Sequence, residues 1–471
     1  MKPSAAVSAT LSVALAATVL LAGGPASAQG RHGGGHPDGE SYPYGTKTPY
    51  EPQGGPKQYE RAPKGYLPVF TENVARHGSR AMTDSEDGDL VLAVLATAEQ
   101  RGALTRLGAG LAPQVRTLLG AASAVGYGNL AGRGVREHRE TALRMEQRLP
   151  ELFRTIAAEH ESVVVETSGV ARTVASADAF TSGLTEGQPS LAGLVKAPVT
   201  DKDLLYFHKQ PQNADYQAYL AHDPDLAAVL AGIEGGPRTG QAARHVAERL
   251  FDAEFVASMS AEDRIAFARA LHQLYSSAPD LADEAPTVDL DPYLTSRDAQ
   301  WFGYLDDAEE FYQKGPGFAG RTITYRMAQP LLDDLFAAVE AKAAGTGHDG
   351  AVLRFTHAEE IEPLAALMGL PGSTEPAAPD EPYTYRNDEW RGGQVSPMAA
   401  NVQWDLYAGG QGKDGAGKGG TGKDGTGKSP AYLVRMLYNE QETAFKSSCR
   451  PIAKGSYFYD LDELRRCFGR A

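Results

Sequence analysis

The side chains best suited to chemistry in this 471-residue chain gather in one short segment, Arg76-His77-Gly78-Ser79-Arg80. Two guanidinium groups flank an imidazole there. The planar guanidinium of arginine binds phosphate or carboxylate through paired hydrogen bonds, and imidazole is a competent covalent nucleophile. Gly78 is expected to let the backbone approach a bound ligand closely. The segment therefore indicates phosphate chemistry, although a basic surface turn with the same letters stays open as an alternative.

Two further segments could complete such a site. The first is His357-Ala358-Glu359, which stands just before a predicted helix. A helix N-terminus favours bound anions, and the Glu359 carboxyl could donate a proton to a leaving oxygen. Taken alone, a helix-capping glutamate beside a structural histidine explains this triplet more simply. The second segment, RTVASA, begins with Arg172, which could hold phosphate, although a lone arginine is usually solvated.

Each of the three segments comes after a predicted strand. Strands are predicted over residues 65–75, 162–165, 350–356, 401–407 and 431–438. Helices are predicted over residues 89–101, 111–122, 134–149, 175–184 and 361–368. Open α/β sheets bind ligands beyond the carboxyl ends of their strands. The three segments are therefore expected to meet at one edge of a sheet.

The middle of the chain, residues 185–345, has more helical patterns and more acidic side chains. Ser260 and Asp263 form a predicted capping box before a helix whose apolar residues share one face. Strands alternating with helices on both sides of this block predict an α/β domain over residues 66–184 and 346–471. An inserted helical domain, residues 185–345, would interrupt it.

Taken together, the three segments resemble the motifs of the histidine acid phosphatases, and within them the multiple inositol polyphosphate phosphatases, or His-Ala-Glu phytases. The family motif Arg-His-Gly-x-Arg matches residues 76–80, Arg-Thr-x-x-Ser-Ala matches residues 172–177, and His-Ala-Glu matches residues 357–359. Most relatives outside this subgroup have His-Asp in place of the last triplet. Softer likenesses lie at residues 134–153, 311–317 (FYQKGPG) and 399–401.

The resemblance implies a central mixed sheet flanked by helices, with a smaller inserted α-helical domain. It also implies a phosphomonoesterase that needs no metal or other cofactor and acts on inositol polyphosphates, with phytate as the expected substrate. The implied roles are nucleophile for His77, proton donor for Glu359, and phosphate binding for Arg76, Arg80, Arg172 and His357. If Glu359 is not the donor, Asp84 and Glu86 are the nearest alternatives in sequence. A broad acid phosphatase and a non-catalytic phosphate-binding protein stay open as alternative functions.

Charge and composition limit the partners. Lys and Arg number 45 against 60 Asp and Glu, which leaves a formal charge of −15. Wrapping of nucleic acid needs a basic face, so the expected partner is a small molecule rather than a nucleic acid. A few clustered arginines can still make one cleft positive. The sequence does not settle the oligomeric state, and a monomer is the default expectation.

The first 28 residues have the pattern of an export signal. Lys2 precedes an apolar run at residues 11–22, and a small-residue cleavage site follows at residues 26–28. The run is shorter than the roughly 20 residues that a membrane span needs. We therefore predict a secreted protein without a membrane span. Residues 29–65, rich in Gly, Pro, Tyr and His, are predicted to form a mostly irregular lead-in.

Two features near the C-terminus are predicted to be structural. Cys449 and Cys467 are the two cysteines of the chain, and after export such a pair is more often a disulfide than a metal site. Residues 409–429 are rich in Gly and Lys and contain a formal phosphate-loop match at residues 422–429. A true phosphate loop lies between a strand and a helix, whereas here Pro430 follows, so we predict a surface loop.

Overall fold

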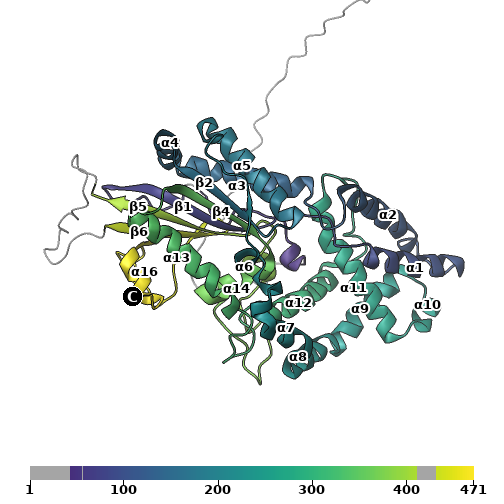
Figure 1. Cartoon of the computed structure of the whole chain (residues 1–471). Helices are drawn as coiled ribbons and strands as arrows, with labels where there is room; N and C mark the ends of the chain where they lie inside the picture. The colour runs from purple at the N-terminus through teal and green to yellow at the C-terminus, as the bar shows by residue number, and fades with distance from the viewer. Residues whose placement is uncertain (1–42, 56, 411–430, 471) are drawn as a thin grey trace, which may run out of the picture. The chain divides into compact units, whose positions relative to one another are not determined.

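The computed structural model describes residues 43–55, 57–410 and 431–470, and it contains a mixed sheet with helices on either side (Figure 1). In the described residues its order is β3-β2-β4-β1-β5-β6-β7, with β8 also paired to β6. The strands are β1 (Tyr66–Arg76), β2 (Ser162–Thr167), β3 (Val199–Thr200), β4 (Asp349–Thr356), β5 (Asn401–Gly409), β6 (Tyr432–Tyr438), β7 (Gln441–Thr443) and β8 (Phe458–Asp460). The predicted α/β fold with a mixed sheet is confirmed.

Pairing is parallel in the half of the sheet formed by β3, β2, β4 and β1, and antiparallel from β5 onward. Alternate side chains of a strand face opposite sides of the sheet. Val74 accordingly packs into one core cluster and its neighbour Ala75 into the other. Both faces of the sheet are therefore buried, which explains the apolar runs that predicted its strands.

Helices cover both faces of the sheet (Figure 1). One core cluster joins the strands to α3, α4 and α5, and the other joins them to α13, α14 and the remaining helices. The helices are α1 (Glu86–Gln100), α2 (Gly108–Val125), α3 (Gly132–Arg148), α4 (Pro150–Glu159), α5 (Ala171–Gly187), α6 (Lys202–Leu205), α7 (Ala214–His222), α8 (Pro224–Glu234), α9 (Pro237–Leu250), α10 (Ala253–Ser258), α11 (Ala261–Ser277), α12 (Ser296–Gln313), α13 (Gln329–Ala343), α14 (Ala358–Met368), α15 (Gly392–Val395) and α16 (Leu461–Cys467). Within the described ranges, no helix is long and apolar enough to cross a membrane.

Residues 185–345 are mainly helical, and the predicted capping box of Ser260 and Asp263 opens α11. Two helices from earlier in the chain pack against helices of this block: α1 contacts α11, and α2 contacts α9. The division into an α/β domain and an inserted helical domain stays a prediction. The predicted export signal, residues 1–28, and all but two residues of the Gly and Lys tract lie outside the described residues.

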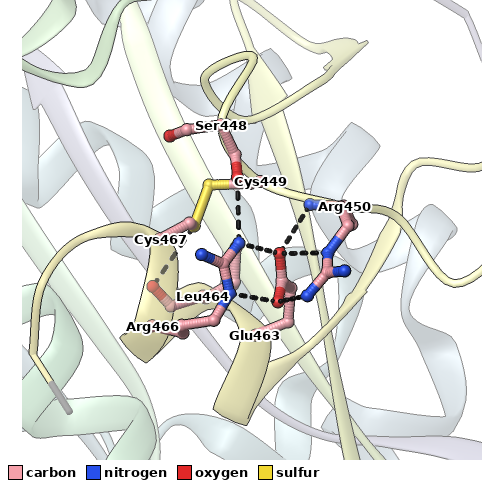
Figure 2. Close-up of a disulfide and its surroundings, with 7 residues drawn as sticks. All are labelled: Ser448, Cys449, Arg450, Glu463, Leu464, Arg466 and Cys467. Atoms are coloured by element: carbon pink, nitrogen blue, oxygen red, sulfur yellow. Dashed lines mark hydrogen bonds and ion pairs between the residues drawn. A yellow bond between two sulfur atoms is a disulfide. The ribbon is translucent and has the colours of Figure 1, made fainter.

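Cys449 and Cys467 form the expected disulfide, which joins the segment after β7 to the last turn of α16 (Figure 2). Beside it, the Glu463 carboxylate accepts hydrogen bonds from the Arg450 backbone at 2.8 Å and from the Arg466 guanidinium at 2.6 Å (Figure 2). The disulfide, the Arg450–Glu463 ion pair and a hydrogen bond from Arg466 to the Ser448 carbonyl at 3.0 Å fasten the C-terminal helix to the chain that precedes it.

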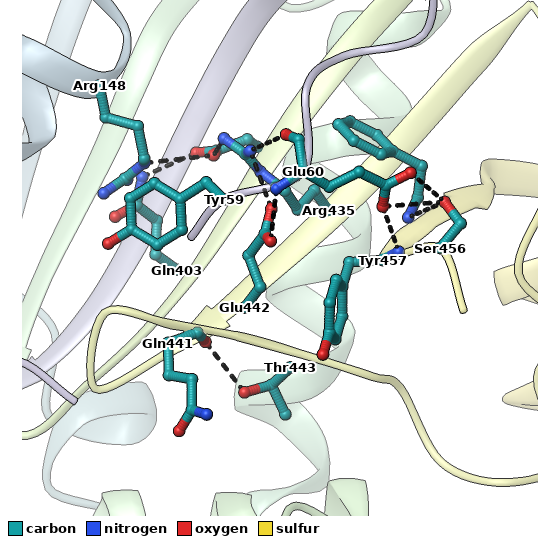
Figure 3. A network of polar contacts seen from close by, with 12 residues as sticks. Tyr59, Glu60, Arg148, Gln403, Arg435, Gln441, Glu442, Thr443, Ser456 and Tyr457 are labelled. Carbon is teal, nitrogen blue, oxygen red and sulfur yellow. Dashed lines mark hydrogen bonds and ion pairs between the residues drawn. The ribbon is translucent and has the colours of Figure 1, made fainter. Parts of the chain in front are cut away.

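The described part of the lead-in, residues 43–55 and 57–65, contains the short 3-10 helix Gly45–Lys47, and polar contacts hold its end against the sheet (Figure 3). The Glu60 backbone donates a hydrogen bond to Glu442 at 2.7 Å, and the Glu60 carboxylate accepts from Ser456 and Tyr457. Arg435 pairs with Glu442 at 3.1 Å and donates to the Glu60 carbonyl (Figure 3). This anchoring lets the earlier residues of the lead-in contribute to the site described below.

We predict that replacing both cysteines, Cys449→Ser with Cys467→Ser, lowers the free energy of unfolding by about 3 kcal/mol, because the unfolded chain regains the entropy of an open loop. Urea unfolding of the oxidised wild type and the double variant measures the difference. A reducing agent should bring the wild type to the level of the variant and leave the variant unchanged. Equal stabilities under oxidising conditions would show that the disulfide contributes nothing.

Candidate active site

Three parallel strands end side by side, and the predicted motifs follow them directly. Arg76, the last residue of β1, lies opposite Thr356, the last residue of β4. The β2 end is in the same row, since Thr167 lies opposite Phe355. Beyond this row, the backbone of His77 donates a hydrogen bond to the Thr356 carbonyl at 2.8 Å. The sheet therefore brings together segments almost 300 residues apart.

His77 is buried, with an exposed fraction of 3%. Its Nδ1 lies 2.9 Å from the Gly78 carbonyl oxygen. That oxygen can only accept, so Nδ1 carries the hydrogen and the lone pair is on Nε2. Burial, followed by the charges of Arg76 and its neighbours, lowers the pKa of His77 well below its usual value. The ring therefore stays neutral, and Nε2 stays nucleophilic, in acidic solution.

Three arginines surround this histidine: Arg76, Arg80 and Arg172. Two backbone carbonyls hold the Arg76 guanidinium in place, since its Nη1 donates to the carbonyls of Thr46 and Ser396 at 2.5 Å each. In all three arginines the Nε group is buried and has no hydrogen-bond partner. Burial and the neighbouring guanidiniums lower the pKa of Arg80 to about 10, so it remains charged. Buried donors without acceptors cost free energy, which a bound anion would recover.

His357 has a different arrangement from His77. Arg172 Nη2 donates to its Nδ1 at 3.0 Å, which leaves Nε2 to donate to Ser168 Oγ at 2.9 Å. Burial and the Arg172 charge lower the pKa of His357 to about 3. The ring is therefore neutral, and both nitrogens are occupied in orienting Arg172 and the turn after β2. Its predicted contact with phosphate stays a prediction.

Glu359 lies in the first turn of α14, with about a third of its side chain exposed. Burial favours the neutral form of its carboxyl, but the charges of Lys314 and His208 outweigh this and hold its pKa well below the usual value. Glu359 is therefore ionised in this structure. The two alternative donors are both exposed, and of the two only Asp84 lines a cavity of about 140 Å³ beside Arg80.

Two buried carboxyl groups, those of Glu137 and Asp280, contact the residue that follows the Arg-His-Gly segment, Ser79. Ser79 Oγ lies 2.8 Å from both Glu137 Oε1 and Asp280 Oδ1. A hydroxyl has one hydrogen to donate, so one carboxyl must be protonated. Burial raises the pKa of Glu137, but the hydrogen bonds that its carboxyl accepts from the backbones of Ser79 and Tyr50 oppose this and favour its ionised form. Burial and the Glu137 charge raise the pKa of Asp280 to about 7, so Asp280 holds the proton in acidic solution.

The lead-in also supplies a cation that sequence reasoning missed. Lys47 lines the cavity beside Arg80, and its Nζ donates to the neutral side chains of Gln273 and Ser276. Tyr50, which also belongs to the lead-in, donates a hydrogen bond from its hydroxyl to Glu440 at 2.9 Å. No apolar period marks this region, so nothing local could have indicated its place beside the site.

Gly78 meets a packing constraint that the sequence did not indicate. A Cβ at Gly78 would lie 2.7 Å from the Cα and the carbonyl oxygen of Gly134 in α3. A Cβ at Gly134 would in turn lie 2.2 Å from the Ser79 carbonyl oxygen. A glycine is therefore required here because the Arg-His-Gly segment packs directly on a helix, and its expected close approach to a ligand stays a prediction.

The profile of the histidine phosphatase superfamily (branch 2) matches residues 70–190 and 241–439. The chain therefore belongs to this superfamily, as its motifs predicted. It is a phosphoric monoester hydrolase.

Individual proteins are similar to this chain over most of its length. The complex of a Bifidobacterium longum multiple inositol polyphosphate phosphatase with inositol hexasulfate is 33% identical, has a TM-score of 0.81, and the match covers 91% of this chain and 97% of that one. Multiple inositol polyphosphate phosphatase 1 of Gallus gallus is 26% identical, over 86% of this chain and 84% of that protein. A phytase of D. castellii shares the fold, with a TM-score of 0.62 at 16% identity over 91% of this chain and 84% of that one.

We predict that Gly134→Ala displaces the Ser79 backbone and lowers stability by about 1–3 kcal/mol. Hydrolysis of phosphate esters should fall about 100-fold, because small displacements of reacting groups have effects of this order. Thermal unfolding and phosphate release measure the two effects. Gly120→Ala in α2 is the matched control, since its Cβ would meet open space. Normal hydrolysis by Gly134→Ala would show that the close approach is dispensable.

Proposed function

We propose that the protein removes phosphate from inositol polyphosphates, including myo-inositol hexakisphosphate, through a phosphohistidine on His77. The carrying observation is the neutral, buried His77, with its lone pair on Nε2, among three arginines whose Nε donors are unpaired. The substrate class is supported by the relatives, which are named as inositol polyphosphate phosphatases and include one bound to inositol hexasulfate. A dense polyanion suits a cluster of this charge.

The proposed reaction has two steps at phosphorus. His77 Nε2 forms a bond to phosphorus while the bond to the inositol oxygen breaks, and Glu359 gives its proton to that oxygen. Glu359 then takes a proton from water, whose oxygen attacks phosphorus and frees His77. The guanidiniums of Arg76, Arg80 and Arg172 would stabilise the charge on the transferring group, because donors fixed in a dry site need no reorganisation.

Because Glu359 is ionised in this structure, it must gain a proton when substrate binds. A phosphate ester placed beside it adds negative charge, which disfavours the carboxylate and raises its pKa. The substrate thereby helps to protonate its own donor. After the alcohol leaves, less negative charge remains and Glu359 can act as the base.

We also propose that the protein acts outside the cytoplasm. The support is the export-signal pattern of residues 1–28 in the sequence and the disulfide between Cys449 and Cys467. The two alternative functions, a broad acid phosphatase and a phosphate-binding protein without turnover, are separated from the proposed one by the variants that follow.

His77→Ala should abolish turnover of inositol hexakisphosphate but leave binding of the product phosphate measurable, because the arginines remain. When the wild type is quenched rapidly during turnover, an acid-labile phosphoryl group should be trapped on His77. His348→Ala, at an exposed histidine, is the control and should behave as the wild type. Turnover by His77→Ala near the wild-type rate would exclude the phosphohistidine.

Glu359→Gln keeps the size of the side chain but removes its transferable proton. General acid catalysis contributes about 10² to 10⁴-fold, so transfer from inositol hexakisphosphate should slow by this range. Transfer from p-nitrophenyl phosphate, whose leaving group needs little protonation, should slow far less in its pre-steady-state burst. An equal loss of the first step with both substrates would assign the donor elsewhere, with Asp84 as the next candidate.

A further inference from the structure

One motif of the sequence, residues 311–317 (FYQKGPG), has no role in the mechanism above. It forms the end of α12 and the turn that follows. The backbones of Lys314 and Gly315 both donate to the Glu310 carbonyl, at 2.8 and 3.1 Å. A Cβ at Gly315 would lie only 3.0 Å from the Phe311 carbonyl oxygen, and Gly317 has a φ of +62°. The turn is therefore tight, and it fixes where Lys314 emerges from the helix.

The Lys314 ammonium reaches the proposed proton donor. Its Nζ lies 2.5 Å from Glu310 Oε2 and 3.6 Å from Glu359 Oε1. The lysine side chain is largely buried, with 14% exposed. Burial favours its neutral form, but Glu310 and Glu359 outweigh this and raise its pKa well above the usual value. Lys314 is thus a fixed positive charge between two carboxylates of different helices.

Other groups complete the surroundings of Glu359. Glu362, one turn further along α14, is fully buried, and its two carboxyl oxygens have no hydrogen-bond partner. Burial and the Glu310 charge raise the pKa of Glu362, which keeps it neutral. The other charged or titratable groups that interact with Glu359 are His208, His357, Arg172, Arg80, Glu360 and Tyr216. Of the cations around Glu359, Lys314 influences its carboxyl most strongly.

We propose that Lys314 is a positioning residue for proton transfer: it holds Glu359 as a carboxylate in the free enzyme, so that Glu359 accepts its proton only when the negative charge of a phosphate ester arrives. This inference rests on the proposed role of Glu359 as proton donor. It explains how one carboxyl serves as acid and then as base. Once Glu359 has given its proton to the leaving oxygen, the Lys314 charge stabilises the carboxylate that must next accept a proton from water.

The test is the pH dependence of kcat/KM for inositol hexakisphosphate, which reports the ionisation of the free enzyme. Without the lysine charge, Glu359 stays protonated to higher pH. Lys314→Gln should therefore move the alkaline limb upward by about one pH unit, the lower end of the effect of a neighbouring opposite charge. Lys314→Arg should restore the wild-type limb. Glu310→Gln should move the limb downward, because Lys314 then pairs with Glu359 alone.

The matched control is Lys342→Gln. Lys342 has a similarly buried side chain, 12% exposed, but it pairs with Glu161 at the far end of β4 from the site. Its profile should match the wild type. If Lys314→Gln folds poorly because Glu310 loses its partner, the double variant Glu310→Gln with Lys314→Gln removes both charges and should show a limb above that of Glu310→Gln alone.

Two outcomes would overturn the inference. One is a folded Lys314→Gln protein whose limb does not move. The other is an equal loss of kcat/KM at every pH, which would mean that Lys314 binds the substrate instead. Neither outcome affects the proposed function if Glu359→Gln still loses transfer from inositol hexakisphosphate selectively. If that selectivity is absent, the donor assignment itself fails, whatever the Lys314 variants do.

Discussion

The parallel pairing of β2, β4 and β1 is the constraint on which the site depends. Parallel strands end at the same edge, and the register places Arg76, Thr356 and the β2 terminus in one row. The residues that follow these three strands therefore all emerge from the same edge of the sheet. Helices α5 and α14 begin just beyond this edge, so their first turns carry Arg172 and Glu359 toward His77. A change of register would separate the three motifs while leaving each of them intact.

Electrostatics gives this edge its chemistry. The chain as a whole is acidic, yet the site contains three arginines whose buried Nε donors lack partners. The same burial and charge keep His77 neutral and nucleophilic. Free energy that the fold loses by burying these cations becomes available for binding an anion, since preorganised donors need not be rearranged. Stability and function are thus opposed here, and the surrounding sheet and helices must hold the cluster together.

Support for the cluster comes largely from parts of the chain outside the three motifs that follow the strands. The irregular lead-in provides the Thr46 carbonyl for Arg76 and places Lys47 beside Arg80. Helix α3 packs so closely on the Arg-His-Gly segment that both Gly78 and Gly134 must lack a side chain. The turn after α12 brings Lys314 to Glu359. These contacts control position and protonation rather than the identity of the reacting groups.

The sequence by itself determined the fold class, the strands and helices around the three motifs, the α11 capping box and the family. These depend on local patterns, such as apolar periodicity and short runs of fixed residue types, which can be read without knowing the neighbours in space. It did not indicate that Gly78 packs against α3, and it missed Lys47. It also left the 311–317 motif without a role. Only the tertiary structure revealed the packing of Gly78, the place of Lys47 and the contacts of the 311–317 turn. Each depends on a contact between segments far apart in the chain, and the close packing that makes such a contact leaves no local pattern.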